Sequence, residues 1–367
     1  MQLHLARETL LGPLQQVIGV IEKRQTLPIL SNVLIRMNEG EIELTGTDLE
    51  VQLVTKTTAH FSGAKDVTVP ARKLLDIFRL LPEGSEVSLD IGDDHFGIRC
   101  GGSRFNLATL PASSYPAFDS GATDLEVLVP SKLLRSALEK TMFAMAQQDV
   151  RYYLNGLLFD LTGSTFRTVS SDGHRLAVFQ ETLPTSANAN RQIIIPRKGI
   201  LELYRFLGDN DDSVSLEIGP NTIRANLGDV SFSAKLVEGR FPDFQRVMPK
   251  ELNRRYIIER DAFKAALTRV SILSNEKYKS ISLSVEETGT LSIKAQNPEH
   301  EEAEERLAVT MEGGPISVGF NAAYLLDAVN NVDSDTVSMA FTEAANSCLI
   351  EDAQDSRFKF IVMPMRL

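Results

Sequence analysis

Two short runs of residues have the composition of a chemical site, and the first of them looks like a hydrolase triad. Ser171, Asp172 and His174 supply the three residue types, but they lie within four positions of one another. The members of a triad converge from separate segments, and neighbours on one strand or tight turn cannot readily meet at one reacting atom. We therefore predict a protein that is not an enzyme, in which His174 helps to shape the wall of a binding groove.

The second run is acidic and covers Glu299–Glu305, with a histidine at position 300. It could hold a divalent cation, but a solvated acidic strand or loop is the commoner use of such a composition. The two cysteines, Cys100 and Cys348, match no metal or redox spacing, which fits a reducing cytosol. The sequence has no GxxxxGK[ST] phosphate loop and so indicates no ATPase. We expect no metal ligand and no cofactor.

Two further regions have residue types suited to binding. Tyr152 and Tyr153 follow Arg151 and could stack on exposed bases or bond phosphates. The alternative is two strand tyrosines packed on a core. Met363 and Met365 flank a proline beside the chain end, and methionine surfaces repack around different peptides. The alternative there is a final edge strand buried in the last domain.

The elements that position these residues recur three times along the chain. A strand end, a polar turn and an apolar helix begin at Val69, Ile195 and Val318, with spacings of 126 and 123 residues. The phenylalanines Phe105, Phe232 and Phe358 lie 127 and 126 residues apart. A self-similarity at fixed period indicates a repeated structural unit.

Each repeat is predicted to hold two helices and several strands. The expected helices cover residues 7–24, 70–81, 131–141, 197–208, 260–270 and 321–332. Alternating stretches such as GEIELTGTDLEVQL and STFRTVSSDGHRLAVF are typical of strands joined by tight turns. The fold class is therefore α+β, with three similar domains over residues 1–122, 123–250 and 251–367.

Composition and charge limit the class of protein. The chain has 367 residues, 43% hydrophobic and 24% charged, which excludes a disordered or low-complexity chain. No apolar run approaches the ~20 residues of a membrane span, and the N-terminus lacks a signal-peptide pattern, so we expect a cytoplasmic protein without membrane contact. The six helical segments carry a net charge of +8, which leaves −19 on the rest of a chain whose total is −11. Basic helices with acidic strands and loops suit contact with nucleic acid; ordinary solvated helix faces are the alternative, and a protein-interaction scaffold without DNA remains open.

Eleven segments in order carry a resemblance to a known family. They are TLPILSNVL, LTGTDLEV, VPARKLLDI, RFNLATLPASSYP, MAQQDVRYYLNGLLF, SDGHRLAV, IPRKGILEL, KLVEGRFPDF, ILSNEKY, NPEHEEAEE and VMPMRL. From the first helix to the last residue the chain resembles the bacterial sliding clamps, the beta subunits of DNA polymerase III. The resemblance implies a non-catalytic processivity factor: a head-to-tail homodimeric ring of six domains, with helices lining a hole that encircles duplex DNA without reading its sequence.

The resemblance also implies three sets of site residues. The DNA contacts would be Arg24, Arg72, Gln148, Tyr152 and Tyr153. A groove for short motifs of the polymerase alpha subunit, the clamp loader complex, and other polymerases and repair proteins would comprise Leu154, Ser171, Gly173, His174, Arg175, Leu176, Pro242, Arg246, Val247, Asn321, Tyr324, Ser347, Val362, Met363, Pro364 and Met365. The dimer contacts would be Lys73, Arg104, Phe105, Leu107, Ile272, Leu273, Glu299, Glu301 and Glu304. Gln147 and Ser171 depart from the histidine and threonine expected in the family, and a neutral Gln147 would weaken one DNA contact.

Overall fold

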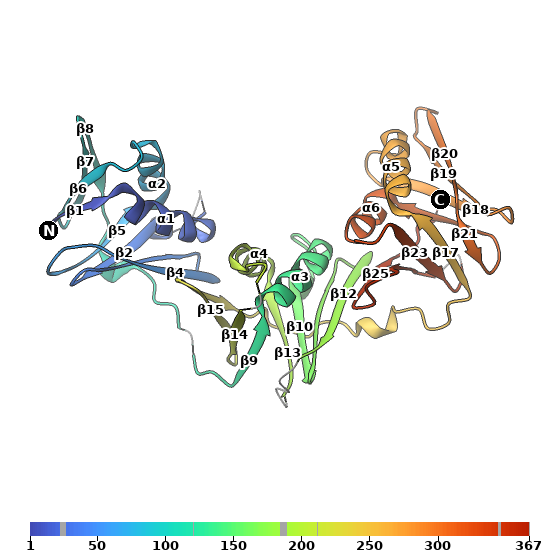
Figure 1. Ribbon diagram of the computed structural model, residues 1–367, viewed down its shortest axis with the longest axis horizontal. Helices are drawn as coiled ribbons and strands as arrows, with labels where there is room; N and C mark the ends of the chain where they lie inside the picture. Colours follow the sequence, from blue (N-terminus) through green and yellow to red (C-terminus); the bar gives the residue numbers. More distant parts are fainter. Residues whose placement is uncertain (23–26, 120, 184–188, 211, 344–345, 367) are drawn as a thin grey trace. The chain divides into compact units, whose positions relative to one another are not determined.

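Six α-helices lie in the described part of the chain, two in each third of the sequence as predicted. The computed structural model describes residues 1–22, 27–119, 121–183, 189–210, 212–343 and 346–366 (Figure 1). The helices are α1 (Arg7–Val17), α2 (Ala71–Leu80), α3 (Ser131–Thr141), α4 (Arg197–Phe206), α5 (Arg260–Val270) and α6 (Ala322–Asn330). The mixed helix and sheet content confirms the α+β class.

The first helix is shorter than predicted. It ends at Val17, and a 3-10 turn (Ile18–Val20) and an extended Ile21 follow it. Branched side chains at four of the five positions 17–21, with Gly19 between them, account for this early end because both residue types have poor helix propensity. Arg24 therefore does not end the first helix, contrary to the prediction, and it lies outside the described residues.

The first compact unit comprises Met1–Arg135 and Lys198–Leu236. Its strands are β1 (Gln2–Ala6), β2 (Asn32–Asn38), β3 (Glu41–Thr47), β4 (Val51–Thr58), β5 (Ala64–Pro70), β6 (Glu86–Ile91), β7 (His95–Cys100), β8 (Ser103–Ala108), β9 (Leu125–Pro130), β14 (Ser213–Ile218), β15 (Thr222–Leu227) and β16 (Val230–Lys235). They form a four-stranded sheet, β1-β6-β7-β8, and an eight-stranded sheet, β5-β2-β3-β4-β16-β15-β14-β9. The pairing of β4 with β16 joins the first and central thirds of the chain into one sheet.

The second compact unit comprises Ser136–Arg197 and Val237–Leu367. Its strands are β10 (Gly156–Gly163), β11 (Thr165–Ser171), β12 (Arg175–Thr182), β13 (Ala189–Pro196), β17 (Arg254–Glu259), β18 (Ser280–Val285), β19 (Thr290–Gln296), β20 (Glu302–Ala308), β21 (Thr310–Glu312), β22 (Ile316–Asn321), β23 (Thr336–Phe341), β24 (Cys348–Asp352) and β25 (Phe358–Val362). A nine-stranded sheet has the order β13-β10-β11-β12-β25-β24-β23-β17-β21, and a four-stranded sheet has the order β20-β19-β18-β22. Strand β25 pairs on both sides, with β12 and β24, so the alternative of a final edge strand is wrong.

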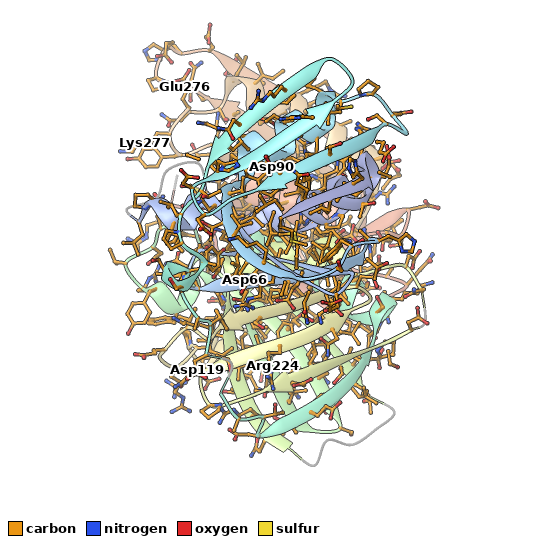
Figure 2. The ribbon with its side chains drawn as sticks, turned by 90° about the vertical axis from the view of Figure 1, so that its left-hand side faces the viewer. Asp66, Asp90, Asp119, Arg224, Glu276 and Lys277 are labelled. Atoms are coloured by element: carbon orange, nitrogen blue, oxygen red, sulfur yellow. The ribbon has the colours of Figure 1, made fainter. Side chains whose placement is uncertain are left out.

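The repeat is visible in the burial of corresponding strands. Strands β6 and β14 share one alternating burial pattern, and β18 has the same two-residue period, as expected of sheets with one face on a core. Helices α1 and α2 lie side by side, as do α5 and α6 (Figure 1). Figure 2 shows Asp66 and Asp90 on strands of the first unit, in keeping with acidic charge outside the helices.

Basic side chains on the helices bond the carbonyl groups at the ends of neighbouring helices. Arg7 at the start of α1 donates to the carbonyl oxygen of Phe78 at 2.7 Å, and Arg135 donates to that of Leu207 at 2.6 Å. In the last repeat, Arg260 donates to the carbonyl oxygens of Val332 and Asp333. These bonds satisfy groups that a helix end leaves unpaired, and the positive charge suits the negative end of the helix dipole. Part of the basic charge of the helices is therefore structural.

Candidate functional site

The loop over residues 147–155, the tyrosine loop, is held by hydrogen bonds to its own backbone. The Asp149 carboxylate accepts from Arg151 through N (2.8 Å), Nε (3.0 Å) and Nη2 (2.8 Å). The Asn155 side chain accepts from the backbone N of Asp149 and donates to its carbonyl oxygen, both at 2.9 Å. The hydrogen bond from Arg151 lowers the pKa of Asp149 to about 2. The loop is thus preformed, with Gln148 in the left-handed region at φ 56°.

The tyrosine loop presents several side chains to solvent, among them Gln148, which is exposed. Val150 is 94% exposed and Tyr152 is 59% exposed, whereas Tyr153 is half-buried against an apolar cluster beneath it. The tyrosines begin a 3-10 helix (Tyr152–Leu154) with ring centroids 6.0 Å apart. They are therefore not strand residues, and only Tyr153 packs on the core. Tyr152 is free to stack on a base or bond a phosphate.

The turn over residues 171–175, the 171–175 turn, uses its serine and aspartate to hold its own backbone. Ser171 Oγ donates to the carbonyl oxygen of Arg175 at 2.7 Å and accepts from the N of Gly173 at 3.0 Å. The Asp172 carboxylate accepts from the N of His174 and the N of Arg175. The His174 ring stacks on Tyr324 of α6, with centroids 6.1 Å apart and planes 16° apart. The three triad-like residues are thus engaged separately, as expected for a protein without a triad here.

Arg175 ties the start of β12 to α6. Its guanidinium bonds Asp172 at 3.0 Å, Asp327 of α6, and the carbonyl oxygen of Phe143 at 3.0 Å. It also lies over the rings of Phe143 and Tyr324, at 5.4 and 4.7 Å from their centroids. Because each donor has a partner and the side chain is largely buried, Arg175 forms a rigid wall and not a mobile charge.

An apolar cluster lies beneath this wall. It contains the buried residues Ala146, Leu154, Leu158, Val169, Leu176, Val178, Ile194, Phe241, Ala340, Leu349 and Ile361, with Tyr153, Val237, Phe244, Val247, Met248 and Leu252 partly buried against it. A cavity of about 530 Å³ opens beside it, lined by Tyr153, Leu158, the polar residues Asp160 and Gln192, and the segment Arg240–Arg246. Pro242 and Arg246 are exposed on that segment. The arrangement offers an apolar recess with a polar rim, which suits a short peptide with apolar anchors.

The chain end lies beside the 171–175 turn. Val362 is fully buried, so it can line the groove only through its backbone, whereas Met363, Pro364 and Met365 are partly exposed. The N of Met363 donates to the carbonyl oxygen of His174 at 2.9 Å, and that of Met365 to Gly319 at 2.8 Å. The first bond fixes the segment after β25 to the 171–175 turn, and the second fixes it to β22.

Two of the residues predicted for the groove bond backbone groups with their side chains. The Asn321 side chain accepts from the N of Ala323 and of Tyr324 and so caps α6, and Ser347 Oγ donates to the carbonyl oxygen of Val247 at 3.1 Å. The tertiary structure adds Phe143 and Asp327, which the sequence analysis missed. Asp327 is 152 positions from Arg175, and no local pattern joins them.

The predicted dimer contacts lie on two unpaired sheet edges and their neighbouring helices. Strands β8 and β20 are the outermost strands of the two four-stranded sheets. On β8, Phe105 and Leu107 are half-buried while Arg104 on the other face is exposed. Ile272, after α5, is 75% exposed. Glu299 and Glu301 immediately precede β20, and Glu304 lies on it.

The acidic run is engaged by cations of the chain itself. Glu304 pairs with Lys294 and Arg306, and Glu305 pairs with Arg269 of α5. These hydrogen bonds and charges hold the pKa of both carboxyl groups below the usual value. Over the described residues, the structure has no group of three or more His, Cys, Asp or Glu placed to hold a metal ion. None of the helices in that part of the chain is long and apolar enough to cross a membrane.

Comparison with known proteins covers the whole length of the chain. Family models of the DNA polymerase III beta subunit match residues 1–119 (N-terminal domain), 128–243 (central domain) and 245–366 (C-terminal domain). The beta sliding clamps of Salmonella typhimurium and Escherichia coli are 46% and 45% identical to it, over 100% of both chains. A sliding clamp of Pseudomonas aeruginosa, solved bound to griselimycin, has 43% identity and a TM-score of 0.95 with full coverage of both chains. The clamp of Caulobacter crescentus has 34% identity and a TM-score of 0.94, again with full coverage of both chains.

Proposed function

Because the chain belongs to the family of the bacterial beta sliding clamp, the beta subunit of DNA polymerase III, we propose that two copies close head to tail into a ring around duplex DNA. The protein is a DNA sliding clamp, a non-catalytic processivity factor that works on DNA with a polymerase. The ring, its contacts and its individual partners are the parts that we propose. We also place it in the cytoplasm, where a bacterial replication protein meets its template.

The complementary edges of the two four-stranded sheets support the ring. Strand β8 offers Arg104, and β20 offers Glu302 and Glu304 on its exposed face. Among the described residues, Lys73 and Arg104 have no carboxylate within ion-pair distance, so both are available to a second copy. Phe105, Leu107 and Ile272 supply exposed or half-buried apolar surface. Different edges that meet with a closing rotation form a closed ring instead of a filament.

The DNA contacts that we propose come from both compact units. Arg72 and Gln148 would bond phosphate groups of the duplex. Tyr152 would stack on a base or bond a phosphate, and Tyr153 would pack beneath Tyr152. Arg24 is the fifth proposed DNA contact. Contacts to phosphate groups carry no sequence information, so binding through them would be independent of sequence. This is the mode that a sliding protein needs.

The recess beside the 171–175 turn is the groove that we propose for partner proteins. Its occupants would be short motifs of the polymerase alpha subunit, the clamp loader complex, and other polymerases and repair proteins. The apolar cluster would take one or two anchor side chains, and Arg175, Arg246 and the chain end would form the rim. We propose the same groove for griselimycin, to which the Pseudomonas aeruginosa clamp is bound.

Retention on circular and linear DNA tests the ring. After loading on a nicked circle, we expect the protein to stay bound through a gel-filtration column, because a closed ring cannot leave a molecule without ends. Cutting the circle once should release it. Equal retention on the two forms would show an ordinary DNA-binding protein and contradict the ring.

A further inference from the structure

The tyrosine loop and the peptide groove share one side chain, Arg151. Within the loop, its Nε and Nη2 atoms donate to the two carboxylate oxygens of Asp149. The same Nη2 atom donates to the backbone oxygen of Asp172, at 3.2 Å, in the 171–175 turn. A single guanidinium therefore joins the proposed DNA contact to the wall of the proposed groove.

The 171–175 turn is shaped around this guanidinium. Gly173 has φ 88°, a conformation that favours glycine, and a β-carbon there would lie 2.9 Å from both Nη atoms of Arg151. A side chain at this position would have to displace the guanidinium, whereas glycine leaves it in place. The 171–175 turn and Arg151 are therefore connected by this packing and by the bond to the Asp172 oxygen.

The connection continues to the chain end. The Asp172 carboxylate holds the N of His174 at 2.9 Å, and the carbonyl oxygen of His174 accepts from the N of Met363 at 2.9 Å. Consecutive hydrogen bonds thus run from Asp149 to the Met363–Met365 segment, all within the second compact unit. A ligand in the groove touches one end of this series and DNA touches the other.

We propose that Arg151 is a positioning residue that couples the two sites, so that a ligand in the groove increases the affinity of the tyrosine loop for DNA, and DNA increases the affinity of the groove. The inference rests on the proposed function, since it takes the loop and the groove as binding sites. Coupling between two binding equilibria is reciprocal and has the same factor in both directions.

The expected sign follows from which groups each ligand restrains. A ligand packed against Gly173, His174 and Met363 restrains the 171–175 turn and keeps the Asp172 carbonyl under Arg151. Arg151 then stays on Asp149 and Tyr152 stays in its exposed position. DNA then binds a tyrosine loop that is already ordered, so the loop loses less conformational entropy when DNA binds. We expect a coupling of about fivefold, at the low end of the usual range because one partly exposed hydrogen bond carries it.

The chain offers a matched pair of variants. Arg151→Lys keeps the positive charge but removes the planar fork that reaches Asp149 and Asp172 together. Arg357 has the same local geometry, with its N, Nε and Nη2 bonded to Asp355 two positions earlier, at 3.0, 2.9 and 2.7 Å. The two side chains are 45% and 41% exposed. Arg357→Lys is therefore the control for the loss of an equivalent fork outside both sites.

The experiment measures the Kd of the full-length dimer for a fluorescent primed duplex, by anisotropy, with and without saturating griselimycin at one salt concentration. The reciprocal titration measures griselimycin affinity with and without the duplex. We expect griselimycin to tighten DNA binding about fivefold in the wild type and in Arg357→Lys. In Arg151→Lys, the ratio of the Kd for DNA without griselimycin to the Kd with griselimycin should fall to about one, while both ligands still bind.

Each other outcome overturns a stated part of the inference. A ratio of one in the wild type, with both ligands bound, overturns the coupling and leaves the two sites standing. A ratio below one overturns its sign, and a full ratio in Arg151→Lys overturns the role of Arg151. Failure of the wild type to bind griselimycin or DNA overturns the proposed site itself, and the coupling with it.

Discussion

At the scale of single residues, the basic side chains of the helices have both structural and electrostatic consequences. Arg72 at the start of α2 is exposed, as a DNA contact requires, yet its Nη2 atom donates to the carbonyl oxygen of Ile21 at 2.7 Å. The bond fixes where the guanidinium lies without neutralising its charge. Such a side chain can contact phosphate with little loss of rotamer entropy.

Replacing Arg24 and Arg72 with Ala should weaken DNA binding. Each lost phosphate contact releases about one counterion fewer, so the slope of log K against log salt should fall by about two for the pair. Because Arg72 bonds Ile21, we also expect the free energy of unfolding to fall by about 1 kcal/mol. Anisotropy across a salt series and urea unfolding measure the two effects. An unchanged salt slope would remove both arginines from the DNA site.

The ionisation of the Asp149 carboxyl group gives a prediction that can be tested by varying the pH. The pKa of its carboxyl group is about 2 against an ordinary value of 3.8, chiefly because Arg151 donates to it. A lowered pKa means that the ionised form stabilises the folded loop above the ordinary value, and that this contribution is lost as pH falls from 3.8 toward 2. At pH 3 the wild-type carboxylate should remain mostly ionised; Arg151→Ala removes the side-chain donor, so the pKa of Asp149 should rise and a larger share of its carboxyl groups should be protonated. Carbon-13 shifts of the Asp149 carboxyl across pH 3–6 measure this, and equal titration in both proteins would contradict the Arg151 contact.

At the scale of elements, the segment after β25 lies beside the 171–175 turn because β25 is an inner strand. Pairing with β12 and β24 fixes its register, with Arg175 and Cys348 both opposite Val362. Met363–Met365 then continues past the 171–175 turn. A strand at the sheet edge would not have placed these residues between a segment from the central third of the chain and a segment from the last third.

Deleting Met363–Leu367 should remove part of the groove and leave the rest of the fold. The five residues follow the last strand, so the nine-stranded sheet keeps all of its strands. A few buried contacts dominate the affinity of most peptide sites, so we expect binding of a fluorescent polymerase peptide, and of griselimycin, to fall at least tenfold. Fluorescence titration and sedimentation of the same samples provide the readout. Equal affinities, with both proteins folded and dimeric, would refute the groove assignment and leave the ring untouched.

At the scale of the whole molecule, a closed ring allows both long retention on DNA and fast sliding along it, whereas direct binding improves one at the expense of the other. Non-specific DNA binding has a Kd of ~10⁻⁴–10⁻⁶ M and association proceeds at ~10⁵–10⁷ M⁻¹s⁻¹, so the product of the two gives escape at roughly 0.1–1000 per second. Tighter contacts would slow both escape and sliding. A closed ring retains DNA by topology while each contact in the hole stays weak.

Replacing Ile272 and Leu273 with Ala should open the ring. Ile272 is 75% exposed in the single chain, so its removal should cost the monomer little, whereas the two side chains together would contribute roughly 3–5 kcal/mol of apolar burial to each proposed interface. We expect a folded monomer by sedimentation at low concentration. Leu128→Ala, at a 47% exposed leucine on β9, is the control and should remain dimeric. A dimeric double variant would show that the interface lies elsewhere.

The sequence by itself determined the features that depend on local patterns. The threefold repeat, the six helices and the hairpin of β11 and β12 follow from periodicity and turn residues, because helix and strand periods act over a few neighbouring positions. The family, and through it the clamp function, followed from eleven ordered segments. The prediction of a helix over residues 7–24 was too long, because the charged residues at 22–24 continued the helical pattern beyond a run of poor helix formers.

The tertiary structure alone decided which distant groups meet. Asp327 reaches Arg175 across 152 positions, and β25 enters the sheet beside β12 instead of closing its edge. The engagement of Arg72 by Ile21, and of Arg151 by Asp149 and Asp172 together, likewise needs the folded backbone. Such contacts are set by strand pairing and helix packing over the whole chain, and composition or spacing near either residue carries no trace of its partner.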